Sequence, residues 1–217
     1  FIEKNYMDLE VWEPSSKVIN KLNLLNSERR HRVKIKVGLQ NQLHDLKKED
    51  KELIKLNKQL IVVLDKQIKI IENDILTLIN SDVELKDKYQ RIQTIPGVGK
   101  VLATLMLIKT KGFSDIKSAR KMACYAGVAP FEHRSGSSIY YKPRVSTMAD
   151  KELKKVLHLA ALSTIRLEND LAKFYKRKVA EGKNKMAVLN AVRNKIIHRI
   201  YAVIKNNSVY NFNLHMS

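Results

Sequence analysis

Cysteine, glycine and proline are scarce in this 217-residue chain, and each shortage excludes a class of protein. A single cysteine, Cys124, cannot form an internal disulfide or a zinc site built from cysteines. Seven glycines and four prolines supply too few turns for a β-rich fold. No apolar run reaches the ~18 residues of a membrane span, and the polar residues 1–13 lack the order of a signal peptide. We therefore expect a helical fold and no membrane partner.

Acidic side chains are scarce as well, but only in the second half of the chain. The whole chain has 41 Lys and Arg against 22 Asp and Glu, which gives a net charge of +19. Residues 1–90 carry 17 basic and 15 acidic side chains, whereas residues 91–217 carry 24 and 7. An excess confined to one half predicts a surface that faces a polyanion, with DNA as the first choice. A solvated basic face without a partner is the alternative.

Residues 15–90 are expected to form a long helix, because they contain no proline and only one glycine, Gly38. Apolar residues recur there at the spacing of a coiled-coil seam, namely Leu39, Leu43, Leu46, Leu53, Leu60, Leu64, Ile71, Ile75, Leu78 and Leu85. A lone helix cannot bury such a seam. We expect a partner helix, either from a second copy through residues 39–85, which makes a homo-oligomer, or from a fold-back near Gly38.

Residues 95–100, Ile-Pro-Gly-Val-Gly-Lys, join two helical patterns. Gly97 and Gly99 allow positive φ and a close approach of backbone N–H groups to a ligand, and the N-terminus of the next helix favours anions. Lys100 adds a positive charge. The segment resembles the helix-hairpin-helix element that holds DNA phosphates without reading sequence. We predict that Gly97, Gly99 and Lys100 contact nucleic acid; a plain tight turn is the alternative.

Residues 131–145 are the one long stretch without a helical pattern, and they combine hydroxyls, a histidine, two tyrosines and three cations. Irregular segments on a rigid scaffold often carry sites. We expect a short hairpin or extended arm over residues 139–145. Arg134, Lys142 and Arg144 are predicted to offset charge on a phosphate. His133 is a possible proton-transfer residue, since the ordinary pKa of histidine is ~6.5.

Helices are predicted after this stretch, first from the capping residues Ser146 and Thr147 to about Glu168 and finally over residues 185–205. The polar face of the last helix carries Arg193, Lys195 and Arg199, which we interpret as phosphate contacts, with a solvated face as the alternative. The fold class is therefore expected to be all-α. A long coiled-coil helix would precede a compact helical domain with a helix-hairpin-helix-like turn and one irregular loop or short hairpin.

Residues 91–205 resemble the C-terminal domain of the DEDD-type insertion-sequence transposases, the IS-one-ten group. The resemblance rests on motifs in a fixed order: Ile95-Pro96-Gly97-Val98-Gly99, Phe113, Tyr125-Ala126-Gly127-Val128-Ala129-Pro130, Ser135-Gly136, Gly182-Lys183 and Arg193-Asn194-Lys195. It extends over the preceding helix, where the family has a coiled-coil stalk. Two positions depart from the usual pattern, because Ala149 stands where the family usually has Gly and Lys154 where it usually has Arg.

The resemblance implies an enzyme that excises and inserts a mobile DNA element. It implies that a serine in the Ser-Gly motif, here Ser135, attacks the DNA phosphodiester and forms a covalent phosphoserine link. It also implies an N-terminal RNase-H-like domain with an acidic metal-binding tetrad, which this sequence lacks. We therefore expect Mg²⁺ in that domain, no cofactor or metal ligands in this chain, and a fragment that is inactive alone. Oligomers, a guide RNA in some members, and a bacterial cytoplasmic, nucleoid-associated location are further implications.

Other interpretations of the same residues stay open. Ser137 and Ser138 lie beside Ser135, and Tyr140 or Tyr141 is an alternative nucleophile or a stacking platform for a base. A different function is a non-catalytic module that binds DNA or RNA through residues 95–100 and oligomerises through its coiled coil. A coiled-coil assembly protein with an incidental basic domain is the third possibility.

Four segments are predicted along the chain. They are residues 1–14 as an extension or linker, 15–90 as a helical coiled-coil segment, 91–205 as the transposase domain and 206–217 as a tail. A chain that begins with Phe is expected to be a piece of a longer protein.

Overall fold

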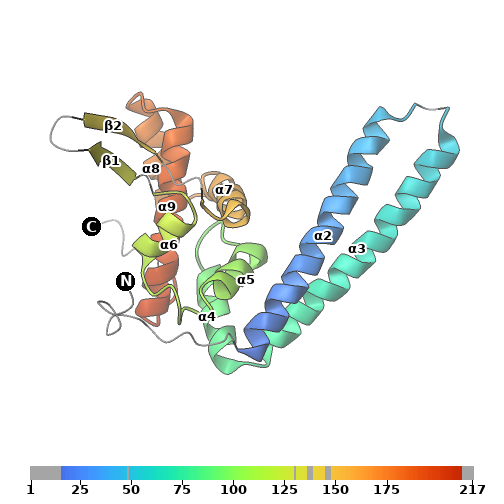
Figure 1. Cartoon of the computed structure of the whole chain (residues 1–217), viewed down its shortest axis with the longest axis horizontal. Helices are drawn as coiled ribbons and strands as arrows, with labels where there is room; N and C mark the ends of the chain where they lie inside the picture. Colours follow the sequence, from blue (N-terminus) through green and yellow to red (C-terminus); the bar gives the residue numbers. More distant parts are fainter. Residues whose placement is uncertain (1–15, 48, 130, 136–138, 145–147, 212–217) are drawn as a thin grey trace.

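The computed structural model describes residues 16–47, 49–129, 131–135, 139–144 and 148–211, with the backbone alone for 131–135 and 139–144. Over these ranges the chain forms eight helices and one two-stranded antiparallel β-hairpin (Figure 1). The predicted all-α class is confirmed. None of the helices in these ranges combines the length and apolar character that a membrane crossing requires.

Two long antiparallel helices, α2 (Lys17–Asp45) and α3 (Lys51–Asn80), project from the rest of the molecule, and we call them the helical arm (Figure 1). α2 begins at Ser16, whose hydroxyl accepts a hydrogen bond from the Ile19 amide at 3.2 Å. Ion pairs cross the arm from Arg29 to Glu72 at 2.6 Å and from Lys36 to Asp65 at 2.5 Å. The residue number rises on α2 as it falls on α3, as an antiparallel pair requires.

The chain turns back within residues 46–50, so residues 15–90 do not form one continuous helix. The fold-back lies beyond Gly38, which sits inside α2, and the Asp50 carboxylate closes the turn by accepting from the Lys47 amide at 2.9 Å. A second break at residues 81–82 ends α3. Asp82 caps the next helix by accepting from the amides of Glu84 and Leu85, both at 3.0 Å.

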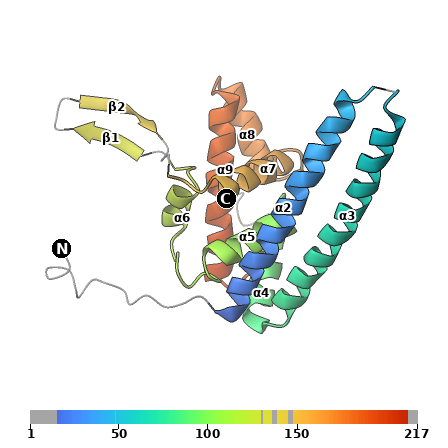
Figure 2. The ribbon, with the colours of Figure 1, turned by 45° about the vertical axis from the view of Figure 1, so that its right-hand side comes forward.

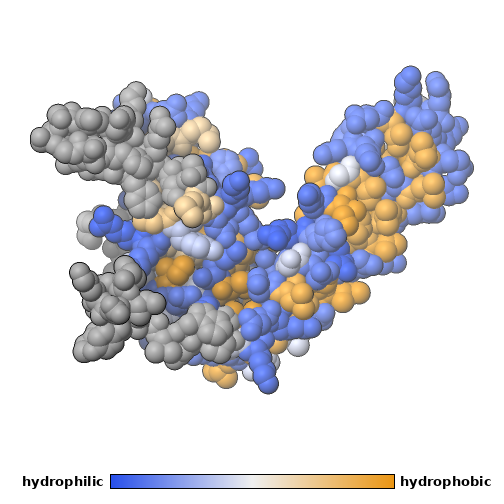
Figure 3. Space-filling model, viewed as in Figure 1, coloured by the Kyte–Doolittle hydropathy of each residue, from blue (hydrophilic) through white to orange (hydrophobic). Residues whose placement is uncertain are grey.

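The expected seam is buried only toward the base of the arm. Leu64 and Ile75 are buried between the helices, whereas Leu53 and Leu60 near the far end are 52% and 46% exposed. Figure 3 shows this as apolar surface along the arm. A two-helix pair has open sides, and these apolar residues lie on them.

Six helices pack together beside the arm, and we call them the head: α4 (Val83–Gln93), α5 (Lys100–Lys109), α6 (Ala119–Tyr125), α7 (Lys151–Thr164), α8 (Asp170–Ala180) and α9 (Lys185–Lys205). Residues 102–108 of α5 are all buried, and α9 contributes Ile196, Ile197 and Ile200. Ile19 and Leu22 from the base of α2 belong to the same core. The base of the arm is therefore part of the folded head.

The β-hairpin consists of β1 (Phe131–Ser135) and β2 (Ile139–Arg144). It projects from the head on the side opposite the helical arm, as both ribbon views show (Figures 1 and 2). Between α5 and α6, the ring of Phe113 lies edge-on to Tyr201 of α9 with centroids 5.2 Å apart, and the Tyr201 hydroxyl donates to the Ile116 carbonyl at 2.5 Å. Phe113 therefore anchors the connection that leads toward the β-hairpin.

Candidate nucleic-acid interface

The turn at residues 95–99 has one closed side, which packs on the end of α7. Gly97 has a φ of +82°, and a Cβ built there would lie 2.2 Å from Thr164 Oγ1 and 2.6 Å from its backbone nitrogen. The Thr164 hydroxyl lies within hydrogen-bond distance of the Pro96 carbonyl, at 2.9 Å, and of the Ala160 carbonyl, at 2.8 Å. Only glycine fits at position 97, and its direct role is close packing.

The other side of this turn is open. Gly99 is the N-cap of α5, and among the described residues a Cβ there would meet no atom within 4 Å and no side chain caps the helix. The first amide groups of α5 lack intrahelical acceptors, and the helix dipole adds partial positive charge at this end. Lys100 is exposed beside them. This arrangement favours an anion at Gly99 and Lys100.

The base of the β-hairpin is fixed where α6 meets α7. Gly127 has a φ of +63°, and a Cβ there would lie 2.4 Å from the Cβ of Ala149. The Asp150 amide donates to the Tyr125 carbonyl at 2.9 Å. From α9, the side-chain amide of Asn190 donates to the Val128 carbonyl at 2.8 Å. Both ends of the hairpin therefore leave from backbone that three helices hold.

Asp150 organises this base through its carboxylate. One oxygen accepts from the Leu153 amide at 2.8 Å and caps α7, while the other lies 2.8 Å from Lys109 Nζ and accepts from the Tyr125 hydroxyl at 3.1 Å. The cap is thus Asp150 itself, whereas the expected capping residues Ser146 and Thr147 lie outside the described residues. Burial opposes the charge on Asp150, but the Leu153 amide and Lys109 outweigh it, so the pKa of Asp150 lies below its usual value.

The β-hairpin carries the predicted nucleophile at its far end. In the strand register Ser135 pairs with Ile139, Arg134 with Tyr140 and His133 with Tyr141, while Arg144 pairs with Phe131 at the base. For these residues and Lys142 the described structure consists of the backbone. Gly136, Ser137 and Ser138 lie outside the described residues. Ser135 therefore ends β1, at the position in the ladder farthest from the head.

The turn and the hairpin base lie at opposite ends of α7. Gly97 contacts Thr164 at the C-terminus of this 14-residue helix, and Gly127 contacts Ala149 just before its N-terminus. At ~1.5 Å per residue, the two contacts are about 20 Å apart. The candidate residues therefore do not form one compact pocket.

The three predicted cations of α9 have three different environments. Lys195 is exposed, with its Nζ 4.7 Å from the centre of the Phe174 ring. Arg199 pairs with Asp170, which also accepts from the Tyr210 hydroxyl at 2.6 Å. Arg193 is 7% exposed, and its Nε has no hydrogen-bond partner in the described part of the chain. Of these three cations, only Lys195 is exposed on the surface, as expected for a residue that contacts phosphate.

Arg193 and His158 face each other between α9 and α7. Burial lowers the pKa of the Arg193 guanidinium. Burial, together with the charge on Arg193, also lowers the pKa of His158. Over the described ranges, no group of three or more His, Cys, Asp or Glu side chains is placed to hold a metal ion. The family resemblance assigns Mg²⁺ to the acidic N-terminal domain and not to these residues.

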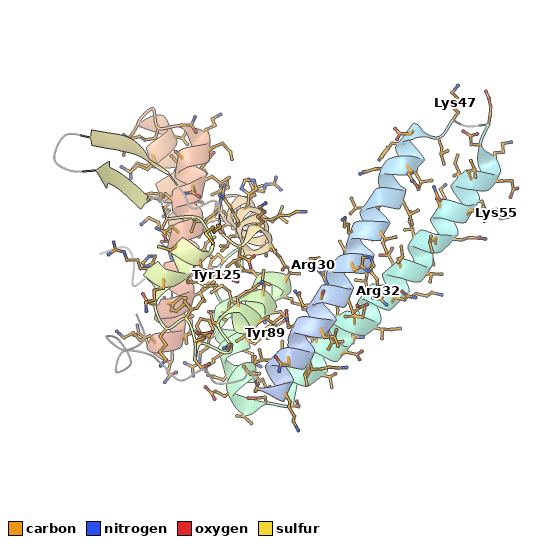
Figure 4. All side chains as sticks on the ribbon, viewed as in Figure 1. Arg30, Arg32, Lys47, Lys55, Tyr89 and Tyr125 are labelled. Atoms are coloured by element: carbon orange, nitrogen blue, oxygen red, sulfur yellow. The ribbon has the colours of Figure 1, made fainter. Side chains whose placement is uncertain are left out.

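Sequence reasoning missed a cleft of about 740 Å³ between the helical arm and the head. α2 and α3 line one side, α5 and α7 line the other, and Gly99 and Lys100 open into it. Figure 4 shows Arg30 on the side of α2 that faces the head. Its guanidinium lies 2.6 Å from Glu152 of α7. The basic run at residues 29–32 was the available signal, but sequence alone did not show which of these side chains faces the head.

The described part of the chain is a basic helical head with an open helix N-terminus and a projecting β-hairpin, and comparison with known proteins shows what it is similar to. Residues 89–176 match the transposase IS116/IS110/IS902 family, from the end of α4 into α8. Over these residues the chain is similar to the domain that this transposase family shares.

Three relatives illustrate the similarity. The pilin gene-inverting protein of Moraxella bovis is 32% identical over 146 residues, which cover 67% of this chain and 45% of the relative. The insertion element IS900 42 kDa protein of Mycobacterium paratuberculosis is 28% identical over a region that covers 60% of this chain and 34% of the relative. The insertion element IS110 43.6 kDa protein of Streptomyces coelicolor is 26% identical over a region that covers 61% of this chain and 32% of the relative. The chain spans less than half the length of these relatives.

Proposed function

We propose that this chain is the DNA-binding and serine-bearing part of a transposase, and that Ser135 is its nucleophile. The observation that carries the proposal is the family match over residues 89–176, a segment that includes the β-hairpin together with α6 and α7, two of the three helices that hold its base. The same half of the chain has 24 basic and 7 acidic side chains, a balance of +17 that favours a DNA partner.

In the proposed step, the Ser135 hydroxyl oxygen forms a bond to a DNA phosphorus atom. The bond from that phosphorus to one of its ester oxygens breaks, and the chain of DNA remains linked to the serine as a phosphodiester. The serine proton passes to a base, for which His133 is the candidate, and the departing oxygen takes up a proton. Arg134, Lys142 and Arg144 offset the charge that develops on the phosphorus oxygens.

The fixed base of the β-hairpin supports this role for Ser135. A nucleophile must be held in line with the bond that breaks, and small misplacements lower the rate steeply. Tyr125, Gly127, Asp150 and Asn190 hold the two ends of the hairpin by contacts within the head. Mg²⁺, carried by an acidic domain outside this sequence, would supply Lewis-acid chemistry.

The remaining predicted residues bind nucleic acid in this proposal. Gly99 and Lys100 offer backbone N–H groups and a charge at the open end of α5, while Gly97 sets the shape of the turn. Lys195 offers an exposed cation on α9. Arg193 and Arg199 lie on the same helix, and each keeps at least one buried nitrogen atom without a partner among the described residues.

The outer part of the arm supports a proposed homo-oligomer through residues 39–85. Leu53, Leu56, Leu60 and Val63 follow one another along α3 at helical spacing and are 46% to 57% exposed. Apolar stripes of this kind mark interaction surfaces. A purely monomeric mass in light scattering would contradict the oligomer.

The nucleophile is tested with a suicide DNA substrate, in which the cleaved strand diffuses away and traps any covalent intermediate. The protein is used in the longest form that its gene encodes. We expect a protein–DNA adduct that resists denaturation, with the phosphate mapped to Ser135 by mass spectrometry. Ser135→Ala abolishes the adduct, whereas the matched variants Ser137→Ala and Ser138→Ala retain it.

The outcome separates the transposase from the non-catalytic binding module, two of the three functions that the sequence leaves open. Loss of the adduct in Ser138→Ala but not in Ser135→Ala would move the nucleophile to the neighbouring serine. If neither the wild type nor any variant forms an adduct, although all of them bind DNA, the result would favour the non-catalytic module that binds through its turn at residues 95–99.

A further inference from the structure

The cleft between the helical arm and the head is a second candidate binding site. It lies on the arm side of the head, whereas the β-hairpin projects from the opposite side (Figures 1 and 2). Its volume of about 740 Å³ is in the range of pockets for small organic ligands. A nucleic acid duplex is far too wide to enter it, but a single nucleotide is not.

The walls of the cleft are aliphatic. Leu76 lies on the α3 side, and Val101, Val156 and Leu159 lie on the side of α5 and α7. Leu159 is 56% exposed and Val101 is 37% exposed, so the head leaves this apolar surface uncovered. Flat, apolar faces of a base that has left its stack are commonly held between such side chains.

Positive charge surrounds this apolar surface. Lys100 and Lys155 line the cleft, and neither has an ion pair within the described ranges. The uncapped N-terminus of α5 opens at the same place. Arg29 and Arg30 also line it but are already paired, with Glu72 and Glu152. The charge left over by these pairs is positive, which complements an occupant that carries a phosphate.

The floor of the cleft holds a buried polar group. Tyr89 is 5% exposed, and its hydroxyl lies close to the Thr104 side chain without a hydrogen bond of good geometry among the residues that the structure describes. Thr104 of α5, which is 4% exposed, lines the same floor. A buried hydroxyl that is poorly hydrogen-bonded loses free energy, which a well-placed incoming donor or acceptor restores. The edge of a nucleobase offers both kinds of group.

We propose that this cleft binds one unpaired nucleotide of DNA or RNA. The base lies between Leu159 and Leu76, its polar edge reaches Tyr89, and its phosphate lies at Lys100 and the N-terminus of α5. This inference rests on the proposed nucleic-acid-binding function and refines it, because it names an unpaired nucleotide as what the turn at residues 95–99 contacts.

The test compares fluorescently labelled duplexes of equal length, one fully paired and one with a single unpaired nucleotide at its centre, each made in DNA and in RNA. We expect the chain to bind the duplex with the unpaired nucleotide about tenfold more tightly, as insertion of one base into an apolar site allows. A preference in either the DNA or the RNA pair supports the inference and identifies the nucleic acid.

Two variants locate the effect in the cleft. Leu159→Asp is expected to remove most of the preference while leaving the affinity for the fully paired duplex within about twofold. Tyr89→Phe, which deletes only the phenolic hydroxyl, is expected to reduce the preference by about threefold. Leu167→Asp is the matched control, because Leu167 is 47% exposed and lies outside the cleft. Circular dichroism melts verify that each variant is folded.

Equal binding of both duplexes by the wild-type chain overturns this inference but leaves the proposed DNA-binding function standing. Failure to bind any duplex contradicts the proposed function itself. A change in oligomeric mass caused by Leu159→Asp, without any change in the preference, would show that a second protein copy occupies the cleft and would also overturn the inference.

Discussion

The helical arm and the head use apolar residues in opposite ways. In the head, α5 and α9 place Leu105, Met106 and Ile196 where they are at most 1% exposed. In the outer arm, Leu53 and Leu56 are more than half exposed. The head therefore completes its own core, while the outer arm leaves apolar side chains exposed. The charge is divided as well, since the basic excess belongs almost entirely to the head's half of the sequence.

The largest expected effect concerns the turn of the head. Gly97→Ala places a Cβ against the Thr164 backbone at a φ of +82°, so we expect it to lower the free energy of unfolding by about 4 kcal/mol. Gly99→Ala is the control, since nothing lies within 4 Å of the added atom, and its expected loss is about 1 kcal/mol or less. Urea unfolding measures both. Equal losses of unfolding free energy in the two variants would contradict the description of this turn as closed at Gly97 and open at Gly99.

The second prediction compares two leucines on α2. Leu22 is fully buried in the core shared with the head, and Leu22→Ala is expected to destabilise the protein by about 3 kcal/mol. Leu24, two residues further on, is 54% exposed, and Leu24→Ala is expected to change stability by less than about 1 kcal/mol. Thermal unfolding measures the difference. Similar losses would show that the base of the arm is not anchored in the head.

A smaller effect is expected at the base of the β-hairpin. Asp150→Asn retains a capping oxygen for α7 but loses the charge that Lys109 contacts, so we expect a loss of about 1 kcal/mol at pH 7. The pKa of Asp150 is lowered in the folded state, so its charge stabilises the fold above the ordinary aspartate pKa of ~3.9.

This stabilisation is lost as the pH falls below that value and through the folded-state pKa. The stability difference between wild type and Asp150→Asn should therefore shrink as the pH is lowered from 5 toward 2, which calorimetry at several pH values measures. A difference that stays constant with pH would contradict the role of the Asp150 charge.

Local patterns predicted the helices and the turn at residues 95–99, because spacing and glycine act on neighbouring residues. The fold-back was not placed correctly, because an apolar seam looks the same whether its partner helix comes from one chain or two. The residues between Asp45 and Lys51 are mostly polar, yet charged runs also occur on exposed helix faces. Asp50 closes this turn by a contact that only the folded backbone shows.

The environments of the candidate site residues were less predictable from the sequence than the helices and the turn were. Arg199 has the spacing of a surface cation, but its partner Asp170 is 29 residues away in the chain. Gly97 and Gly99 look equivalent in the motif, yet only Gly97 contacts α7. The cleft needs α2, α3, α5 and α7 together, and no local pattern contains that combination.

The central claim is that the head, and not the arm, holds nucleic acid by its charge. The most direct measurement is the affinity of the chain for duplex DNA over a range of salt concentrations. We expect the logarithm of the binding constant to fall linearly with the logarithm of the salt concentration, with a slope of about −0.9 for each phosphate neutralised. Lys195→Gln in the head should reduce that slope by about one unit. Lys55→Gln on the arm, whose position Figure 4 shows, should leave it unchanged. An affinity that does not depend on salt, or a slope that changes only with Lys55, would contradict the account.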